Sequence, residues 1–244
     1  MASYEAPGVP PKITFYTFPD CPWCQRVHFI LTELKIPVEQ VFIHLDEPRP
    51  QWYLDINPRG LVPAIKFSND IVTNEIIYES NIISQFLVDL RPSHLLPASL
   101  ADPVAPLRRA RIQFFIDTFQ SKLGSQSRAL LLADEKDKDA KVKEVLAGVE
   151  KEVEPLLANA APFYGGSKEL TYAETQVAPF VLRLYSMSNG TYLPTSLKAG
   201  LQGLPNFSKW AAAVIEHRSI KSNYDEGSVL GRTAKTLEKL KAKA

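Results

Sequence analysis

The order of secondary structure predicted between Lys12 and Leu90 constrains the fold more than any other feature. Strands are expected where β-branched and aromatic residues alternate, and helices where apolar residues recur at helical spacing. The expected elements are a strand at Lys12–Thr17, a helix carrying Val27, Ile30, Leu31 and Leu34, a strand with Val41, Ile43 and Leu45, a helix from Pro50 to Ile56, a hairpin of Ala64–Phe67 and Ile71–Thr73, and a helix at Glu79–Leu90. This β-α-β-α-β-β-α order predicts an α/β layer with a mixed sheet.

The sequence changes character after a proline-rich segment, Arg91–Pro106, which we interpret as a linker. Beyond it, apolar side chains recur only at helical spacing, and Thr171–Glu174 has the form of a capping box that starts a helix. The sequence therefore predicts an α/β domain at residues 1–92 followed by an all-α domain at residues 103–244.

Composition excludes several classes of protein. Apolar residues make up 45% of the 244 and charged residues 23%, as in ordinary globular proteins. The 28 Lys and Arg nearly balance the 27 Asp and Glu, which argues against a dedicated nucleic-acid-binding protein. No apolar run approaches the ~18 residues of a membrane-spanning helix, and the first residues do not resemble a secretory signal. We expect a cytoplasmic protein that interacts with neither membrane nor nucleic acid.

Two cysteines stand three residues apart in Cys21-Pro22-Trp23-Cys24. Cys21 follows a strand and precedes a helix, where unpaired amides and the helix dipole lower a thiol pKa and favour nucleophilic chemistry. Cys24 lies one turn into the helix, as a resolving thiol or as a buried side chain. Half of a zinc site is a further alternative, but no other cysteine is available, and we expect no metal.

Three other segments are candidates for binding. Val62-Pro63 precedes a strand, and a cis peptide bond there would present the Val62 backbone to an extended peptide, whereas a trans bond would be an ordinary strand start. Glu79-Ser80 opens a helix and either binds a carboxylate and an ammonium group or simply caps the helix. Arg49, taken alone, is one of many arginines.

The three motifs together resemble a known family. A strand-Cys-Pro-x-Cys-helix, the turn Asn57–Pro63 and the helix start Tyr78–Ser80 follow in the order found in cytosolic glutathione transferases. A cysteine at the active position, and the run Arg49–Ala64, are similar to the omega class and to the related dehydroascorbate reductases. The resemblance implies a thioredoxin-like glutathione-binding domain followed by a helical domain, and a homodimer.

The resemblance also implies roles for single residues. Cys21 would form a mixed disulfide with glutathione, the co-substrate, and Trp23 would lie near the peptide. Arg49, in place of a lysine of the omega class, would reach a glutathione carboxylate. Val62, before a cis Pro63, would pair with the cysteinyl unit, and Glu79 and Ser80 would hold the γ-glutamyl end. The chain departs from the omega pattern at Cys24, which leaves a dithiol route open.

The implied reaction is glutathione-dependent thiol transfer, with dehydroascorbate, glutathionylated thiols, small disulfides or α-glutathionyl ketones as substrates. The second substrate would bind near side chains of the helical domain that are otherwise expected in its core, namely Phe114, Phe115, Phe180 and Arg183. Two alternatives remain. One is conjugation of glutathione to an electrophile, and the other is a non-enzymatic protein similar to the chloride intracellular channel proteins.

Overall fold

The computed structural model describes residues 11–241. The chain divides into two compact units, an N-terminal unit that ends at Arg91 and a C-terminal unit that begins at Pro92. No helix within residues 11–241 is long and apolar enough to cross a membrane.

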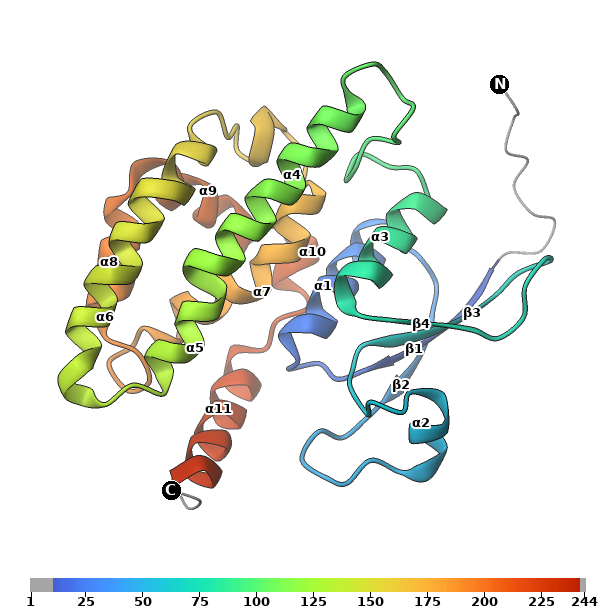
Figure 1. The fold of residues 1–244 in the computed structure, drawn as a ribbon, viewed down its shortest axis with the longest axis horizontal. Helices are drawn as coiled ribbons and strands as arrows, with labels where there is room; N and C mark the ends of the chain where they lie inside the picture. Colours follow the sequence, from blue (N-terminus) through green and yellow to red (C-terminus); the bar gives the residue numbers. More distant parts are fainter. Residues whose placement is uncertain (1–10, 242–244) are drawn as a thin grey trace. The chain divides into compact units, whose positions relative to one another are not determined.

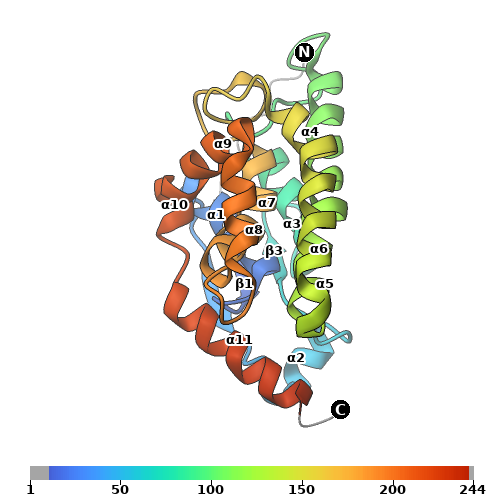
Figure 2. The same ribbon diagram turned by 90° about the vertical axis from the view of Figure 1, so that its left-hand side faces the viewer.

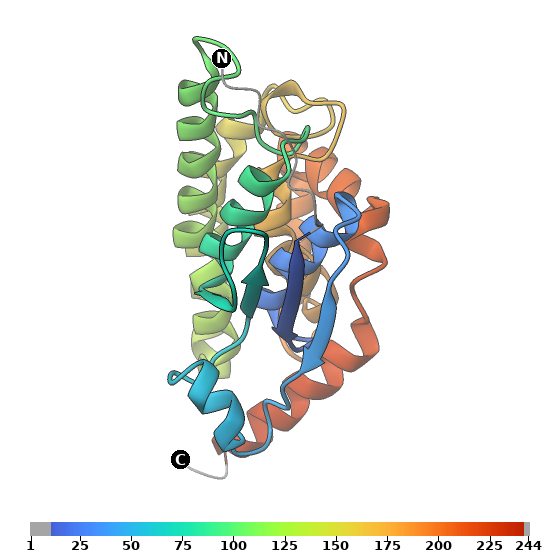
Figure 3. The ribbon, with the colours of Figure 1, turned by 90° about the vertical axis from the view of Figure 1, so that its right-hand side faces the viewer.

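The N-terminal unit is built on a four-stranded sheet in the order β2-β1-β3-β4. Its elements are β1 (Lys12–Thr17), α1 (Pro22–Glu33), β2 (Glu39–Phe42), α2 (Gln51–Ile56), β3 (Ala64–Ser68), β4 (Glu75–Tyr78) and α3 (Ser80–Leu90). Strand β2 runs parallel to β1, while β3 is antiparallel to both β1 and β4 (Figure 3). The predicted α/β order and the mixed, thioredoxin-like sheet are confirmed.

Helices cover both faces of this sheet. Neighbouring residues of a strand point to opposite faces. The ring of Phe15 packs on His28 of α1 with centroids 4.9 Å apart, whereas Tyr16 packs on Tyr53 of α2 at 5.6 Å. Phe67 of β3 meets Phe86 of α3 on the same side as α1 (Figure 1). The core between the sheet and the α1–α3 pair therefore holds the start of α1 rigidly.

Two predicted strands differ from the structure. Ile71–Thr73 is not a strand, because the Asn69 side chain accepts hydrogen bonds from the amides of Ile71 and Val72 and so forms a turn. The returning strand starts only at Glu75. In the second strand, pairing with β1 ends at Phe42, so Ile43 and Leu45 lie beyond β2.

The C-terminal unit is helical from Ala105 onward. Its elements are α4 (Ala105–Phe119), the π-helical turn η1 (Gln120–Gly124), α5 (Ser125–Leu131), α6 (Glu135–Gly148), a second π-helical turn η2 (Val149–Val153), the 3₁₀ turns η3 (Glu154–Leu157) and η4 (Tyr164–Gly166), α7 (Tyr172–Met187), α8 (Thr195–Gly203), α9 (Pro205–Glu216), α10 (Arg218–Lys221) and α11 (Glu226–Lys241). Helix α4 packs against η2, which continues α6 (Figures 1 and 2). The capping box predicted at Thr171–Glu174 is present at the start of α7.

Candidate functional site

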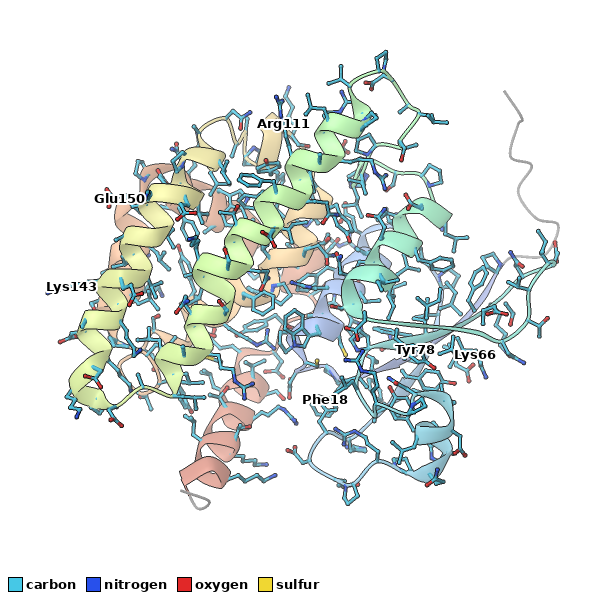
Figure 4. The ribbon with its side chains drawn as sticks, in the orientation of Figure 1. Phe18, Lys66, Tyr78, Arg111, Lys143 and Glu150 are labelled. Atoms are coloured by element: carbon cyan, nitrogen blue, oxygen red, sulfur yellow. The ribbon has the colours of Figure 1, made fainter. Side chains whose placement is uncertain are left out.

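The residues predicted for the site meet at one edge of the sheet. Tyr16 near the end of β1 pairs with Ala64 at the start of β3, and Ala64 pairs with Tyr78 at the end of β4. The segments beyond these residues, which carry Cys21, Val62-Pro63 and Glu79-Ser80, therefore emerge together. Figure 4 labels Phe18 and Tyr78 at this edge.

Cys21 occupies the N-cap position of α1, with extended backbone angles of φ −80° and ψ 119°. Pro22 follows at the first helical position, where no amide donor is missed. The Cys21 thiol points at the Val62 carbonyl, with Sγ 3.9 Å from the oxygen, and the side chain is 7% exposed. The Cys21 side chain makes no capping hydrogen bond with the amides of α1, but its position at the N-terminal end of the helix dipole favours a thiolate.

Cys24 lies deeper than Cys21 and is fully buried, and neither cysteine is in a disulfide. Burial, and next the neighbouring Cys21, raise the pKa of the Cys24 thiol well above its usual value, although contacts with Thr17 and the Phe18 backbone oppose them. Cys24 therefore stays protonated at neutral pH. A protonated thiol is a poor nucleophile, which favours a buried side chain over a resolving thiol.

The Val62-Pro63 peptide bond is cis. Two side chains hold the loop that precedes this bond. Tyr53 Oη and Asn57 Nδ2 both donate to the Leu61 carbonyl, at 2.6 and 2.8 Å. Asn57 also accepts the amide of Arg59 through its Oδ1 at 3.2 Å. The backbone of Val62 is therefore presented by a loop with few degrees of freedom.

Arg49 has a different place from the one expected. Its guanidinium donates to the carbonyls of Gly60 at 2.9 Å and of His44 and Glu47, each at 2.7 Å. Gly60 has a positive φ of 61°, and a Cβ there would lie 3.1 Å from Arg49 Cγ. Arg49 is therefore a brace of the loop before Val62 and does not line the cavity described below.

The start of α3 carries the other polar groups. Glu79 adopts φ 67° and ψ 122°, and its side chain makes no capping hydrogen bond with the helix. Instead its carboxylate forms an ion pair with Arg59, and both side chains are more than half exposed. Ser80, by contrast, is 6% exposed. The sequence leaves two functions open for this helix start, ligand binding and capping. The Glu79 side chain does not cap the helix.

These segments line a cavity of about 310 Å³ in the N-terminal unit. Its wall includes the expected Trp23, Val62, Pro63, Glu79 and Ser80, together with two arginines that the sequence analysis missed, Arg26 and Arg59. Arg59 lies in the turn Asn57–Pro63, but the sequence analysis assigns it no part in binding. Arg26 could have been found as a charged residue within the apolar face of α1, since it precedes the buried Val27. Cationic and anionic side chains together suit a zwitterionic ligand.

The four predicted second-substrate residues belong to the C-terminal unit. Phe115 is fully buried and stacks on Tyr164 at 4.6 Å, with Trp210 at 5.7 Å, so it is a core residue. Phe180 is 8% exposed. Arg183 donates to the Pro179 carbonyl at 2.8 Å, and Phe114 is 59% exposed.

Comparison with known proteins places residues 15–94 in the family described as glutathione S-transferase, N-terminal domain. The chain is 27% identical over 185 residues to a probable glutathione transferase omega-2 of Caenorhabditis elegans, which covers 75% of this chain and 68% of that protein. It is 28% identical over 192 residues to glutathione S-transferase DHAR2 of Arabidopsis thaliana, with 78% of each chain covered. A match of 30% identity to pyrimidodiazepine synthase of Drosophila melanogaster spans about half the length of each protein, 50% and 49%.

Solved structures agree with the sequence comparisons. Glutathione transferase Omega 1C of Trametes versicolor is 26% identical and superposes with a TM-score of 0.77, which covers 93% of this chain and 97% of that one. The matching N-terminal domain, the relatives along the chain and the shared fold lead to one conclusion. Residues 15–94 match the N-terminal domain of the glutathione S-transferases, and the chain as a whole is similar to glutathione transferases of the omega class.

Proposed function

We propose that this protein is a cysteine-dependent glutathione transferase that moves thiol groups through a mixed disulfide between Cys21 and glutathione. The observation that carries the proposal is the position of Cys21 at the N-terminus of α1, with its sulfur against the Val62 carbonyl. Val62, Glu79 and Ser80 line the adjacent cavity. The similarity to the omega class and to glutathione S-transferase DHAR2 supports the same chemistry.

The reaction takes two disulfide exchanges. The Cys21 thiolate attacks the glutathione sulfur of a glutathionylated thiol, so that the Cys21–glutathione bond forms and the substrate leaves as a thiolate that takes up a proton. The thiolate of a second glutathione then attacks the glutathione sulfur of the mixed disulfide. Oxidised glutathione leaves, and Cys21 returns as a thiolate. Glutathionylated thiols and small disulfides are the proposed substrates of these exchanges.

Dehydroascorbate is a further proposed substrate with a different first step: the Cys21 thiolate adds to a carbonyl carbon, and a glutathione thiolate then attacks the Cys21 sulfur, so that the carbon–sulfur bond breaks and ascorbate leaves with the electron pair and takes up protons. The Cys21–glutathione disulfide that remains is reduced by a second glutathione as above.

Conjugation of glutathione to electrophiles is less well supported. It requires a hydroxyl donor beside a glutathione thiolate. The hydroxyls of the neighbouring strand are not placed for it, because Tyr16 is 3% exposed and Thr17 is fully buried, with Oγ1 2.9 Å from Nε2 of His28. The side chain at the end of the loop is a competing nucleophile, Cys21.

Incubation with oxidised glutathione, followed by intact mass and peptide mapping, tests the proposal. We expect the protein to gain one glutathionyl unit on the peptide that holds Cys21, and the Cys24→Ser variant to gain the same unit. The Cys21→Ser variant serves as the matched control and should gain none. An internal Cys21–Cys24 disulfide as the sole product would support the dithiol route instead. In a separate assay with an electrophile and a disulfide, rapid conjugation of the electrophile without reduction of the disulfide would support a conjugating transferase.

The proposal assigns glutathione binding to residues 1–92 and the second-substrate site to residues 103–244. A homodimer and a cytoplasmic location stay predictions, which light scattering on the purified protein and fractionation of cells would check.

A further inference from the structure

Tyr53 is the buried side chain of helix α2, and its hydroxyl reaches the loop that precedes Val62. Its ring is fully buried and packs on Tyr16 of β1, with centroids 5.6 Å apart. Burial raises the pKa of the Tyr53 hydroxyl to about 12, although a hydrogen bond with Asn57 opposes this effect. The phenol therefore keeps its proton at neutral pH, and it acts on the loop as a hydrogen-bond donor.

The Leu61 carbonyl accepts two hydrogen bonds from the end of α2. Tyr53 Oη donates to it at 2.6 Å, and Asn57 Nδ2 donates to it at 2.8 Å. Asn57 is itself 2% exposed, and its backbone amide donates to the Tyr53 carbonyl at 2.7 Å. A carbonyl oxygen has two lone pairs, so both are used. The two donors therefore fix the direction in which the Leu61 carbonyl points.

The direction of this carbonyl also fixes the amide of Val62. The Leu61 carbonyl and the Val62 N–H belong to one planar, trans peptide unit, in which they point in opposite directions. The Val62 N–H therefore points away from Tyr53 and Asn57. No acceptor within residues 11–241 bonds to this N–H, and both Leu61 and Val62 line the cavity of about 310 Å³. An amide without a protein partner beside a cavity is available to a ligand.

We propose that Tyr53 is a positioning residue for glutathione, because its hydroxyl and the Asn57 amide set the direction and the donor strength of the Val62 N–H. The ligand group that this N–H takes is a backbone carbonyl, which the family resemblance places at the cysteinyl unit of glutathione. The inference rests on the function proposed above. It gives Tyr53 a part in binding although Tyr53 is not among the residues that line the cavity.

The two hydrogen bonds on Leu61 also strengthen the donor at the other end of the peptide unit. Withdrawal of electron density from a carbonyl oxygen polarises the N–H of the same peptide group, as in a chain of cooperative hydrogen bonds. Loss of the Tyr53 hydroxyl should therefore weaken the Val62 N–H as a donor even where the loop keeps its shape. Tyr53→Phe isolates this effect, since phenylalanine keeps the ring that packs on Tyr16.

Binding of non-reactive glutathione derivatives to the reduced protein tests the inference without disulfide chemistry. The probes are S-methylglutathione, an analogue of it with a trans alkene in place of the cysteinyl–glycine amide, and an analogue with a trans alkene in place of the γ-glutamyl–cysteine amide. The first analogue lacks the cysteinyl carbonyl, whereas the second retains it. Tyr53→Phe should weaken binding of S-methylglutathione and of the second analogue by the same factor, about threefold to tenfold. It should change binding of the first analogue by less than about twofold, because that analogue lacks the group that the Val62 N–H contacts.

Two controls accompany this comparison. Tyr164→Phe removes a tyrosine hydroxyl that also donates to a backbone carbonyl, that of Arg111 at 3.0 Å, but in the C-terminal unit, and it should change the affinity for none of the three probes. The ratio of wild-type to Tyr53→Phe affinity should stay constant from pH 6 to pH 9, because the raised pKa keeps the Tyr53 hydroxyl protonated throughout.

Circular dichroism and the melting temperature check the fold of the variants. If Tyr53→Phe does not fold, the comparison of probes is made with Asn57→Asp, which has the same shape, loses the other donor to Leu61 and still accepts the Arg59 amide.

An equal loss for all three probes would overturn the inference, because Tyr53 would then support the loop only as part of the core. Unchanged affinities for all three probes would overturn it too. Failure of S-methylglutathione to bind the wild-type protein would overturn the proposed function and this inference with it. The failure of the inference alone is therefore distinguishable from the failure of the proposed function.

Discussion

Two cysteines three residues apart have different chemistry here because α1 begins between them. Cys21 is at the N-cap, while Cys24 is fully buried in the first turn. The sequence alone predicts that both lie near the helix start. It leaves Cys24 open as a resolving thiol, a buried side chain or half of a zinc site. Burial, which depends on how α1 packs on the sheet, was not readable from the spacing, and burial is the first cause of the raised pKa of Cys24.

We predict that Cys21→Ser abolishes reduction of hydroxyethyl disulfide and dehydroascorbate, whereas Cys24→Ser keeps most of it. The reason is that the raised pKa of Cys24 leaves it protonated at neutral pH. Steady-state assays of both variants measure the effect, and a limiting amount of iodoacetamide at pH 7 should alkylate Cys21 first. Equal losses of activity in the two variants would contradict these assignments.

His28 is a second titratable group of the N-terminal unit, and it is partly buried. Burial lowers its pKa from 6.5 to about 4. The folded protein therefore binds this proton less readily than the unfolded chain, so stability is lost as the pH falls from 6.5 towards 4. The full contribution amounts to about 3 kcal/mol.

We predict that His28→Gln removes this part of the pH dependence. Urea denaturation at several pH values measures it, as the difference between wild type and variant. The wild type should lose stability relative to the variant only below pH 6.5. A difference that stays constant from pH 7 to pH 4 would contradict the lowered pKa, since the lost contact with Phe15 has no pH dependence of its own.

At the scale of elements, local pattern predicted most helices and strands, but not where hydrogen bonds from side chains interrupt them. Apolar Ile71 and Val72 favoured a strand, and Asn69 and the positive φ of Asn74 turned the segment into a loop. In the same way, the family resemblance implies a ligand contact for Arg49, whereas in the structure its guanidinium donates to the Gly60 carbonyl. Such contacts depend on residues that the fold brings together.

At the start of α7, local sequence predicts a capping box correctly but does not predict the other partners of its carboxylate. The capping box was predicted from Thr171 and Glu174 alone. The structure adds that Glu174 is fully buried and also accepts from the Tyr164 amide and from Trp210 Nε1, both at 2.8 Å. One carboxylate therefore joins a helix start to a loop and to the core of the C-terminal unit.

We predict that Glu174→Ala destabilises the protein by about 3–5 kcal/mol, because several buried donors lose their acceptor. Thr171→Ala removes the cap and one hydroxyl donor to Glu174 but leaves the other bonds of Glu174, and it should cost about 1 kcal/mol. Chemical denaturation measures both values. Equal costs would mean that the bonds to Tyr164 and Trp210 contribute nothing beyond the capping box.

At the scale of the whole molecule, the residues of the candidate site lie in one unit. Both cysteines, the cavity of about 310 Å³ and its charged wall belong to the N-terminal unit, and the chain has no cysteine after Arg91. The motifs that predicted the family also lie before Arg91. The helical unit lacked such motifs, and so sequence reasoning could name candidates there only by residue type, of which Phe115 is a core residue.

The proposal assigns glutathione to the N-terminal unit and the second substrate to the helical unit, and this assignment can be tested at Phe114. Phe114 is an aromatic side chain on α4 that is 59% exposed. If the helical unit selects the second substrate, Phe114→Ala should change the ratio of kcat/KM for dehydroascorbate and hydroxyethyl disulfide by about threefold or more, since loss of an aromatic contact costs about 1 kcal/mol or more. The same variant should form the Cys21–glutathione disulfide at close to the wild-type rate in a single turnover with oxidised glutathione, because the proposal assigns the binding of the glutathionyl half that Cys21 attacks to the N-terminal unit. Leu132→Ala, which truncates an apolar side chain 49% exposed on the same unit, is the control and should leave both quantities unchanged. A Phe114→Ala variant that slows the single-turnover step and leaves the substrate ratio intact would assign this side chain to glutathione rather than to the second substrate.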